Sequence, residues 1–283
     1  MTGTEKAFGK LNLLLDVPGK RPDGYHEMKM VMQTVSLCDE VTLETGAAED
    51  CCVCDVPGVP SGTDNLALRA AKAFYEEAGI PAEKVRISIR KSIPMQGGMA
   101  GGSADAAAVL RLLNRMHGGP LTSDALQKTG LRLGSDVPYC LVGGTKLAEG
   151  RGEVLSALPA LPDCAFVLLK PEFSVSTPWL FGKLDEASIP HRPDFDAAAD
   201  ALRKRDLDAF CRQTENVFQP VLSACCPQIE TLCRALRERG ALSALLTGTG
   251  SVVFGIFRTL SQAETAAEAF RREKITAYTA KTV

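Results

Sequence analysis

An alternation of apolar and polar residues with a period of two predicts strands in several parts of the chain. The segments 7–15 and 85–90 place an apolar residue at every second position, which fits a half-buried strand. A short apolar run at 165–169 predicts a further strand, and two more apolar runs flank the glycine-containing segment 247–250. Strands are therefore expected in both halves of the chain.

Other segments repeat apolar residues with the three- and four-residue spacing of a helix. One helix is predicted to end at Gly79 and to begin after Asp64 and Asn65, both good N-cap residues, and a second is predicted from 104 to about 116 with Ser103 as its N-cap. Two later helices are predicted from Pro227 to Gly240 and from about Ser261 onward.

A connector rich in leucine and proline at 155–162 marks a change in composition. A chain of 283 residues commonly forms two domains. We therefore expect an N-terminal domain of residues 1–158 and a C-terminal domain of residues 159–283. Strands and helices are interspersed without a regular βαβ repeat, which favours α+β layers over a doubly wound sheet.

The balance of charge restricts the partners of the protein. The 32 lysines and arginines against 34 acidic residues give a net charge of −2, so the chain lacks the basic field that binds nucleic acid. No uncharged apolar run approaches the roughly 18 residues that span a bilayer, and the N-terminus lacks the apolar region of a signal peptide. We expect a cytoplasmic protein that binds neither nucleic acid nor a membrane.

The ten cysteines are scattered through a long chain with abundant apolar residues. Such a chain needs no disulfide scaffold, so reduced thiols are expected. The densest group, Cys51, Cys52 and Cys54, lacks a second well-spaced pair of metal ligands. These side chains are interpreted as half-buried apolar groups, and no metal cage is predicted.

A glycine-rich segment joins the predicted strand 85–90 to the helix that follows it. It consists of Pro94, Met95, Gln96, Gly97, Gly98, Met99, Ala100, Gly101, Gly102 and Ser103. Bare backbone N–H groups directly before a helix form a common phosphate site. The Walker lysine is missing, and Met99 occupies a glycine position of the dinucleotide fingerprint. A tight turn alone needs one or two glycines, so we favour triphosphate binding.

Several further positions carry chemistry that the residues alone leave open. Asp136 lies in a loop bounded by glycine and proline. It is either a turn former or an acid that accepts a proton from a hydroxyl. Lys10 is either a solvated edge-strand residue or a cation that steadies a carboxylate or an oxyanion. Tyr25 and His26 either lie on the surface or bind a planar base. The segment 247–251 is either a hairpin turn or a second set of donors.

Three segments in this order resemble the signature motifs of the GHMP small-molecule kinases. They are the strand around Lys10, residues 94–107 and residues 246–254. The run Asp23-Gly24-Tyr25-His26 resembles more narrowly the branch of this family that phosphorylates a cytidine-diphosphate-linked methylerythritol. Matches at 64–66, 134–138 and 177–181 extend the resemblance over nearly the whole chain.

The resemblance implies an N-terminal domain like domain 2 of ribosomal protein S5, a ferredoxin-like C-terminal domain and an active site in the cleft between them. It also implies ATP and Mg²⁺ as cofactors and phosphorylation of the 2-hydroxyl of the cytidine-diphosphate-linked methylerythritol. Phosphoryl transfer depends on positioning and charge neutralisation, so backbone donors, Mg²⁺, one lysine and one acid suffice. We expect a monomer or a weak homodimer.

The resemblance also assigns roles residue by residue. Asp136 is the base or the acid that orients the hydroxyl, and Lys10 holds that carboxylate and the nucleophile. Ser103 caps the helix and can also place its hydroxyl on Mg²⁺. The remaining assignments are Tyr25, His26 and Phe181 to the cytosine, Asn12 and Thr177 to the substrate pocket, Asn65 and Leu66 to the adenine side, and Thr247 to the far wall.

The loop departs from many relatives at three positions. Gln96 and Ala100 stand where many relatives have glycine. Ala104, which the resemblance assigns with the loop to nucleotide binding, stands where they have serine. A positive φ at Gln96 or Ala100 would cost roughly 1 kcal/mol or more. We therefore expect both residues in ordinary backbone regions, and Ser103 as the one hydroxyl of the loop.

Two other functions compete with this interpretation. A related kinase for homoserine, mevalonate or a sugar would not need an aromatic pocket for a base. An S5-like RNA-binding module would show a basic stripe, whereas the charges of this chain are scattered.

Overall fold

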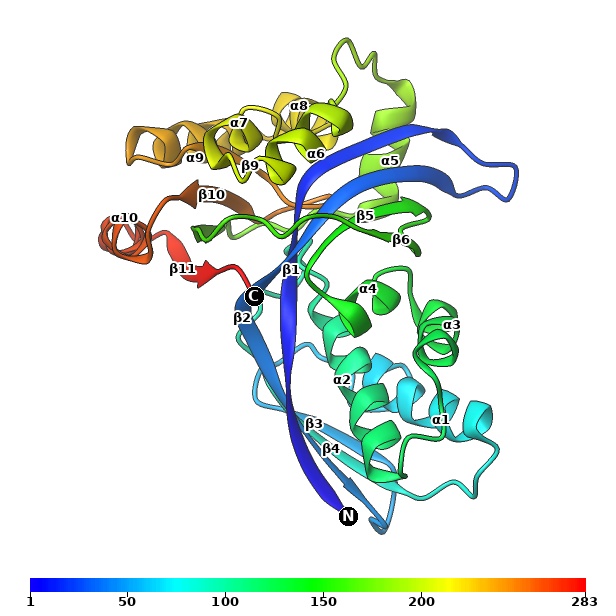
Figure 1. Cartoon of the computed structure of the whole chain (residues 1–283). Helices are drawn as coiled ribbons and strands as arrows, with labels where there is room; N and C mark the ends of the chain where they lie inside the picture. Colours follow the sequence, from blue (N-terminus) through cyan, green and yellow to red (C-terminus); the bar gives the residue numbers. More distant parts are fainter. The chain divides into compact units, whose positions relative to one another are not determined.

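The computed structural model describes all residues from Met1 to Val283. The chain divides into two compact units built from interleaved segments. Unit 1 comprises Met1–Gly9, Leu37–Ile93 and Ala100–Gly143, and unit 2 comprises Lys10–Ser36, Pro94–Met99 and Gly144–Val283. Figure 1 follows the chain through both. None of its helices combines the length and apolar character needed to cross a bilayer.

Two long strands, β1 (Thr2–Lys20) and β2 (His26–Thr45), contribute residues to both units. In unit 1, β2 pairs antiparallel with β4 (Val85–Arg90), and β4 pairs parallel with β3 (Cys51–Cys54). The apolar residues of β4 are buried and the residues between them are exposed, as their alternation predicts. The strand predicted at 7–15 is confirmed, but it is longer at both ends.

The helices of unit 1 pack on one another beside this sheet (Figure 1). The first, α1 (Leu66–Ala78), has the predicted ends: the Asn65 side chain accepts a hydrogen bond from the N–H of Ala67, and Gly79 closes the helix in the left-handed conformation. The others are α2 (Gly101–Met116), α3 (Ser123–Leu133) and the short α4 (Val137–Val142).

The start of α2 differs from the prediction. The helix begins at Gly101 and not at Ala104, so Ser103 lies inside its first turn and is not the N-cap. The N-cap is Ala100, which has left-handed backbone angles and makes no side-chain capping bond. The chain turns into the helix at Ala100 itself, which leaves no role for a side-chain cap three residues later.

In unit 2, strands β5 (Thr145–Gly150) and β6 (Val154–Ala157) extend the sheet from β2, and β8 (Glu215–Asn216) pairs parallel with β1. The helices on either side of β8 follow residue 170 in the chain. They are α5 (Thr177–Glu186), α6 (Phe195–Arg203), α7 (Leu207–Cys211) and α8 (Phe218–Cys225).

The second sheet of unit 2 is fully antiparallel and has the strand order β11-β7-β10-β9. Its strands are β7 (Ala165–Lys170), β9 (Ser243–Leu246), β10 (Val253–Phe257) and β11 (Thr276–Lys281). Helices α9 (Gln228–Glu238) and α10 (Leu260–Arg272) pack against it. The order β-α-β-β-α-β confirms the ferredoxin-like arrangement. Pro227 is the N-cap of α9, whereas the sequence predicted it as the first residue of the helix.

The α+β class is therefore confirmed. The boundary between residues 158 and 159 stays a prediction, because the compact units are assembled from interleaved segments and do not follow the order of the chain.

The backbone of the glycine-rich loop takes an unusual course. Gln96, Gly98 and Ala100 all have positive φ, at 53°, 77° and 60°. The expectation of ordinary angles at Gln96 and Ala100 is therefore wrong. Three left-handed residues at alternate positions reverse the chain repeatedly over a short distance, and a backbone with ordinary angles at two of them would not follow that path. Non-glycine residues here carry strain of roughly 1 kcal/mol each.

This strain predicts that Ala100→Gly stabilises the protein. Glycine adopts a left-handed N-cap without the Cβ clash, so the free energy of unfolding should rise by about 0.5–1 kcal/mol, or a few degrees in Tm. The matched control is Ala73→Gly within α1, which should lower stability by about 1 kcal/mol. Thermal unfolding measures both, and a fall in Tm for Ala100→Gly would contradict the assignment of strain.

Candidate functional site

Lys10 lies in a buried polar cluster of unit 2. Lys10 is 4% exposed, and its Nζ donates a hydrogen bond to Asn12 Oδ1 at 2.6 Å. The backbone N–H of Asn12 donates to the hydroxyl of Thr247 at 3.1 Å, and Thr247 is fully buried. Lys10 is therefore not a solvated edge residue. The structure brings together three residues that the sequence analysis singled out: Lys10, Asn12 and Thr247.

The first half of the glycine-rich loop packs on the turn between β9 and β10. The N–H of Val252 donates to the carbonyl of Gly97 at 3.3 Å, and the N–H of Lys10 donates to the carbonyl of Met99 at 3.2 Å. A Cβ added at Gly98 would lie 2.3 Å from the carbonyl oxygen of Thr247. Only glycine fits at 98, because any side chain would collide with backbone that cannot give way.

Asn216 holds this turn, and the sequence analysis missed it. Its Nδ2 donates to the carbonyls of Leu246 and Gly248, both at 2.8 Å, and its Oδ1 accepts from the N–H of Phe218 at 2.9 Å. The residue is buried. A single asparagine on a two-residue strand between two helices leaves no periodic signal in the sequence. Its role becomes visible only once β8 is paired with β1.

An aromatic cluster of unit 2 contains two of the three residues expected at the cytosine. The rings of His26 and Phe181 lie 4.6 Å apart between centroids, and Phe218 packs edge-on against Phe181 at 4.9 Å. His26 Nε2 lies 2.7 Å from Asp185 Oδ1, which orients the imidazole. Sequence reasoning missed Asp185, although it lies four residues beyond Phe181 on the same helix.

Tyr25 has a different environment. It is 52% exposed, and the guanidinium of Arg151 lies 3.8 Å from the centroid of its ring. One face of the ring is thus covered by a cation. The loop that carries Tyr25 is held by Asp23, whose Oδ1 accepts from the N–H of Tyr25 at 3.1 Å.

Thr177 begins α5 and is exposed. Its hydroxyl lies 3.0 Å from the hydroxyl of Thr249 in the turn between β9 and β10. Lys170 ties the same two segments together, because its Nζ donates to the carbonyl of Phe173 at 2.9 Å and to the hydroxyl of Ser251 at 3.0 Å. Burial lowers the pKa of Lys170. Lys170 and Ser251 are further supporting residues that the sequence analysis did not identify.

In unit 1, Ser103 and the loop before α4 lie close together. The hydroxyl of Ser103 would lie 3.9 Å from a Cβ added at Gly134, two residues before Asp136. Asp136 is the N-cap of α4, but its carboxylate makes no capping hydrogen bond. Asp136 is half-buried, and its role as an acid that accepts a proton stays a prediction.

Two residues expected on the adenine side have structural surroundings of their own. The Asn65 side chain accepts from the N–H of Ala67 at 2.8 Å and donates to the carbonyl of Pro60 at 2.6 Å. Leu66 is the half-buried first residue of α1. Both polar ends of the Asn65 amide make hydrogen bonds within the protein. Its contact with a nucleotide stays a prediction.

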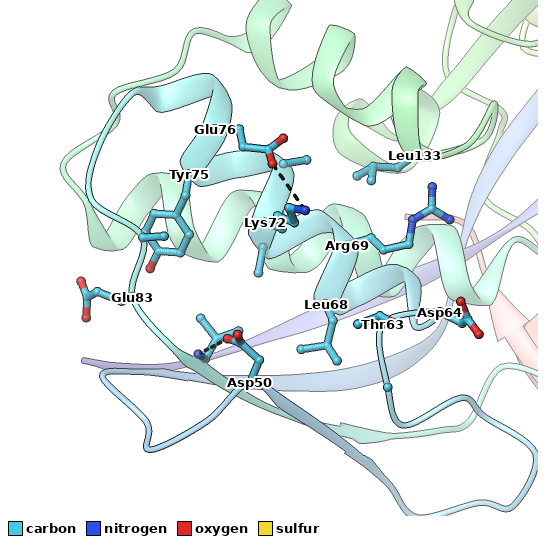
Figure 2. A pocket seen from close by; sticks show the side chains of 15 residues that line it. Asp50, Thr63, Asp64, Leu68, Arg69, Lys72, Tyr75, Glu76, Glu83 and Leu133 are labelled. Carbon is cyan, nitrogen blue, oxygen red and sulfur yellow. Dashed lines mark hydrogen bonds and ion pairs between the residues drawn. The ribbon is translucent and has the colours of Figure 1, made fainter.

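A pocket of about 640 Å³ lies beside α1 in unit 1 (Figure 2). Its lining mixes charges of both signs, including Asp50, Glu83 and Arg69, and Lys72 pairs with Glu76 at 3.8 Å. None of the predicted site residues lines it. Such a mixed surface offers no net positive field for a triphosphate.

The N-terminus of α2 is the part of unit 1 best suited to an anion. The first N–H groups of any α-helix have no partner within the helix, and here they belong to Gly101, Gly102 and Ser103. The positive end of the helix dipole lies at the same place. The residue types therefore combine backbone donors, one hydroxyl and one nearby acid.

Comparison with known proteins accounts for this combination. The model of the GHMP kinases N terminal domain matches residues 65–144, and the model of the GHMP kinases C terminal domain matches residues 198–276. Among solved structures, a homoserine kinase from Cytophaga hutchinsonii is 17% identical with a TM-score of 0.74. The match covers 100% of this chain and 94% of the homoserine kinase. That likeness shows the fold alone.

Closer relatives share more of the sequence. The 4-diphosphocytidyl-2-C-methyl-D-erythritol kinase of Acetivibrio thermocellus is 38% identical over 98% of both chains. That of Geobacillus kaustophilus is 43% identical over 89% of this chain and 87% of its own. A solved 4-(cytidine 5'-diphospho)-2C-methyl-D-erythritol kinase is 31% identical, with a TM-score of 0.83 over 99% of this chain and 98% of its own. The chain therefore belongs to the 4-diphosphocytidyl-2-C-methyl-D-erythritol kinases, within the GHMP kinase family.

Proposed function

We propose that this kinase transfers the γ-phosphoryl group of ATP to the 2-hydroxyl of 4-diphosphocytidyl-2-C-methyl-D-erythritol. The reaction converts an alcohol into a phosphate monoester and belongs to the non-mevalonate route to isoprenoid precursors. The observation that carries the choice of substrate is the aromatic pair of His26 and Phe181 in unit 2, whose rings lie 4.6 Å apart and are tilted by 31°. GHMP kinases for homoserine or mevalonate have the same fold, so the fold alone does not select among substrates.

The aromatic pair suits a cytosine base for physical reasons. Aromatic rings offer a flat apolar surface on which a base can stack, while an imidazole held by Asp185 presents its remaining nitrogen in a fixed direction. Tyr25, with one face against Arg151, keeps the other face for stacking. Asn12, Thr177 and Thr247 would contact the remainder of the substrate.

Asp136 and Lys10 would prepare the nucleophile. The carboxylate of Asp136 would orient the 2-hydroxyl or accept its proton, and the buried ammonium of Lys10 would stabilise negative charge on the attacking oxygen. Phosphoryl transfer needs no covalent intermediate on the protein, so these two residues with the phosphate loop suffice.

The loop from Pro94 to Ser103, together with Ala104, would bind the triphosphate through backbone N–H groups and the positive end of α2. Asn65 and Leu66 would border the adenine. The hydroxyl of Ser103 lies close to the 134–136 loop and suits Mg²⁺. Mg²⁺ prefers hard oxygen ligands, and where it binds nucleotide phosphates the protein supplies only a few of them. When bound, Mg²⁺ would neutralise charge on the phosphates.

We also propose that the enzyme works in the cytoplasm. All ten cysteines are free thiols, as expected of a protein kept in a reducing compartment.

The role of Asp136 predicts that Asp136→Asn lowers kcat by about 10²–10⁴-fold while nucleotide affinity is retained, because only the acid–base contribution is removed. ATP consumption with 4-diphosphocytidyl-2-C-methyl-D-erythritol measures the rate. Asp124→Asn, an exposed acid in the first turn of α3, is the control and should leave the rate unchanged. Unchanged turnover in Asp136→Asn would refute this role.

The cytosine pocket predicts that Phe181→Leu raises KM for the cytidine substrate by about tenfold, since the stacking surface is lost and aliphatic bulk is kept. KM for ATP should not change. The control is Trp179→Leu, an exposed aromatic residue on the same helix. Steady-state kinetics with each substrate varied decide the matter, and an equal effect on both KM values would argue against a cytosine pocket.

A further inference from the structure

Arg111, in the C-terminal half of α2, links three elements of unit 1 and has no part in the chemistry proposed above. Its Nη1 donates to the carbonyl of Cys140 in α4 at 2.6 Å, and its Nε donates to Oε1 of Glu5 on β1. The side chains of Arg111 and Glu5 are 25% and 16% exposed. One planar guanidinium therefore bonds to α4 through one nitrogen and to β1 through another.

The Cys140 carbonyl needs a donor from outside its own helix. Because α4 ends at Val142, the residue four positions after Cys140 is Gly144, which lies beyond the helix and donates its N–H to the hydroxyl of Thr34. An arginine near the C-terminus of a helix satisfies such a carbonyl and interacts favourably with the negative end of the helix dipole. Arg111 has this relation to α4.

The position of α4 depends on contacts of this kind. A helix of six residues is too short to be stable alone, and its N-cap residue makes no side-chain capping bond. Apolar packing supplies part of the support, since a Cβ added at Gly130 in α3 would lie 2.9 Å from Val137 and Tyr139 is 1% exposed. Apolar contacts have little directional preference, whereas a hydrogen bond fixes distance and direction. Arg111 therefore adds the directional restraint.

A displacement of α4 would move Asp136. Asp136 is the N-cap of α4, and its carbonyl accepts from the N–H of Cys140 at 3.0 Å. The residue that Arg111 holds by its carbonyl is thus bonded through its N–H to the backbone of Asp136, one helical turn away. Any change in the bond to Arg111 is passed to Asp136 through a single turn.

The helix that carries Arg111 also presents the proposed phosphate donors. Ser103 lies in its first turn, and Arg111 follows roughly 12 Å further along the same helix. Phosphoryl transfer requires the hydroxyl and the phosphate to be in line, and a misplacement of about 1 Å can cost about 100-fold in rate. A bond between α2 and α4 fixes the distance between the phosphate site and the acid.

We propose that Arg111 is a positioning residue for Asp136, and that its bond to the Cys140 carbonyl sets the distance from this acid to the N-terminus of α2. The inference rests on the proposed role of Asp136. It adds a residue that acts through the backbone of α4 and not by contact with a substrate.

Arg111→Met tests this role, because it keeps the aliphatic bulk of the side chain and removes both hydrogen bonds. We expect kcat to fall about 10–100-fold, since Asp136 is no longer held in line with the phosphate. KM for ATP and KM for the cytidine substrate should each change by less than about twofold, since the donors of α2 and the aromatic pair of unit 2 are unaltered. Steady-state kinetics measure these values, and thermal unfolding checks the fold.

Arg115→Met is the matched control. Arg115 lies one turn further along α2 and pairs with the same acid, Glu5, at 2.9 Å, but it makes no hydrogen bond to α4. Its removal should leave kcat unchanged. An equal loss of kcat in both variants would show that the charge around Glu5 matters and not the bond to α4, and would overturn the proposal.

A double variant decides whether Arg111 acts through Asp136. Residues that act as one unit are not additive, so Arg111→Met in an Asp136→Asn background should lower kcat by less than about twofold further. Two losses that multiply would mean that Arg111 supports the reaction by another route, and would overturn its role as a positioning residue for Asp136.

Arg111→Lys keeps the positive charge and removes the planar fork. A single ammonium cannot bond to Glu5 and to the Cys140 carbonyl in the directions of a guanidinium, so kcat should fall about fivefold with both KM values unchanged. If Arg111→Met does not fold, the lysine variant decides alone. Full kcat in Arg111→Lys, in an enzyme that Asp136→Asn inactivates, would then overturn the role of Arg111 and leave the proposed function intact. A wild type that does not phosphorylate the cytidine compound would overturn both.

Discussion

The close approach of bare backbone to other backbone is the constraint that governs the loop from Pro94 to Ser103, which we propose binds phosphate. Three left-handed residues turn the chain, and Gly98 passes so near the carbonyl of Thr247 that no side chain fits. The course of this backbone decides where α2 begins and which N–H groups open its first turn. It also explains why supporting residues such as Asn216 lie far from the loop in sequence but hold the turn on which it packs.

The proposed choice of substrate depends on a separate set of residues. Kinases of low sequence identity have this fold, so the fold alone does not select the acceptor, and we propose that side chains of unit 2 do. The rings of His26 and Phe181 pack against each other, and Asp185 fixes the imidazole. Each of these contacts is a short-range packing or hydrogen-bonding effect.

Much of the fold follows from periodicity and end signals in the sequence. The alternation at 85–90 and the capping residues of α1 are local properties of the chain, so β4 and α1 lie where the pattern predicts them. The ordinary backbone expected at Gln96 and Ala100 is wrong, because tertiary packing overrides the preference of a single residue. Two supporting residues, Asn216 and Lys170, were not identifiable, since their partners lie in distant segments and leave no spacing in the sequence.

The most direct test of the central claim is to identify the product. The purified enzyme is incubated with ATP, Mg²⁺ and an equimolar mixture of 4-diphosphocytidyl-2-C-methyl-D-erythritol, homoserine and mevalonate, and the reaction is followed by ³¹P NMR. The account predicts one new phosphate monoester resonance, on the 2-hydroxyl of the cytidine compound, with its diphosphate left intact. Phosphorylation of homoserine or mevalonate in preference to the cytidine compound, or hydrolysis of ATP without transfer, would contradict it.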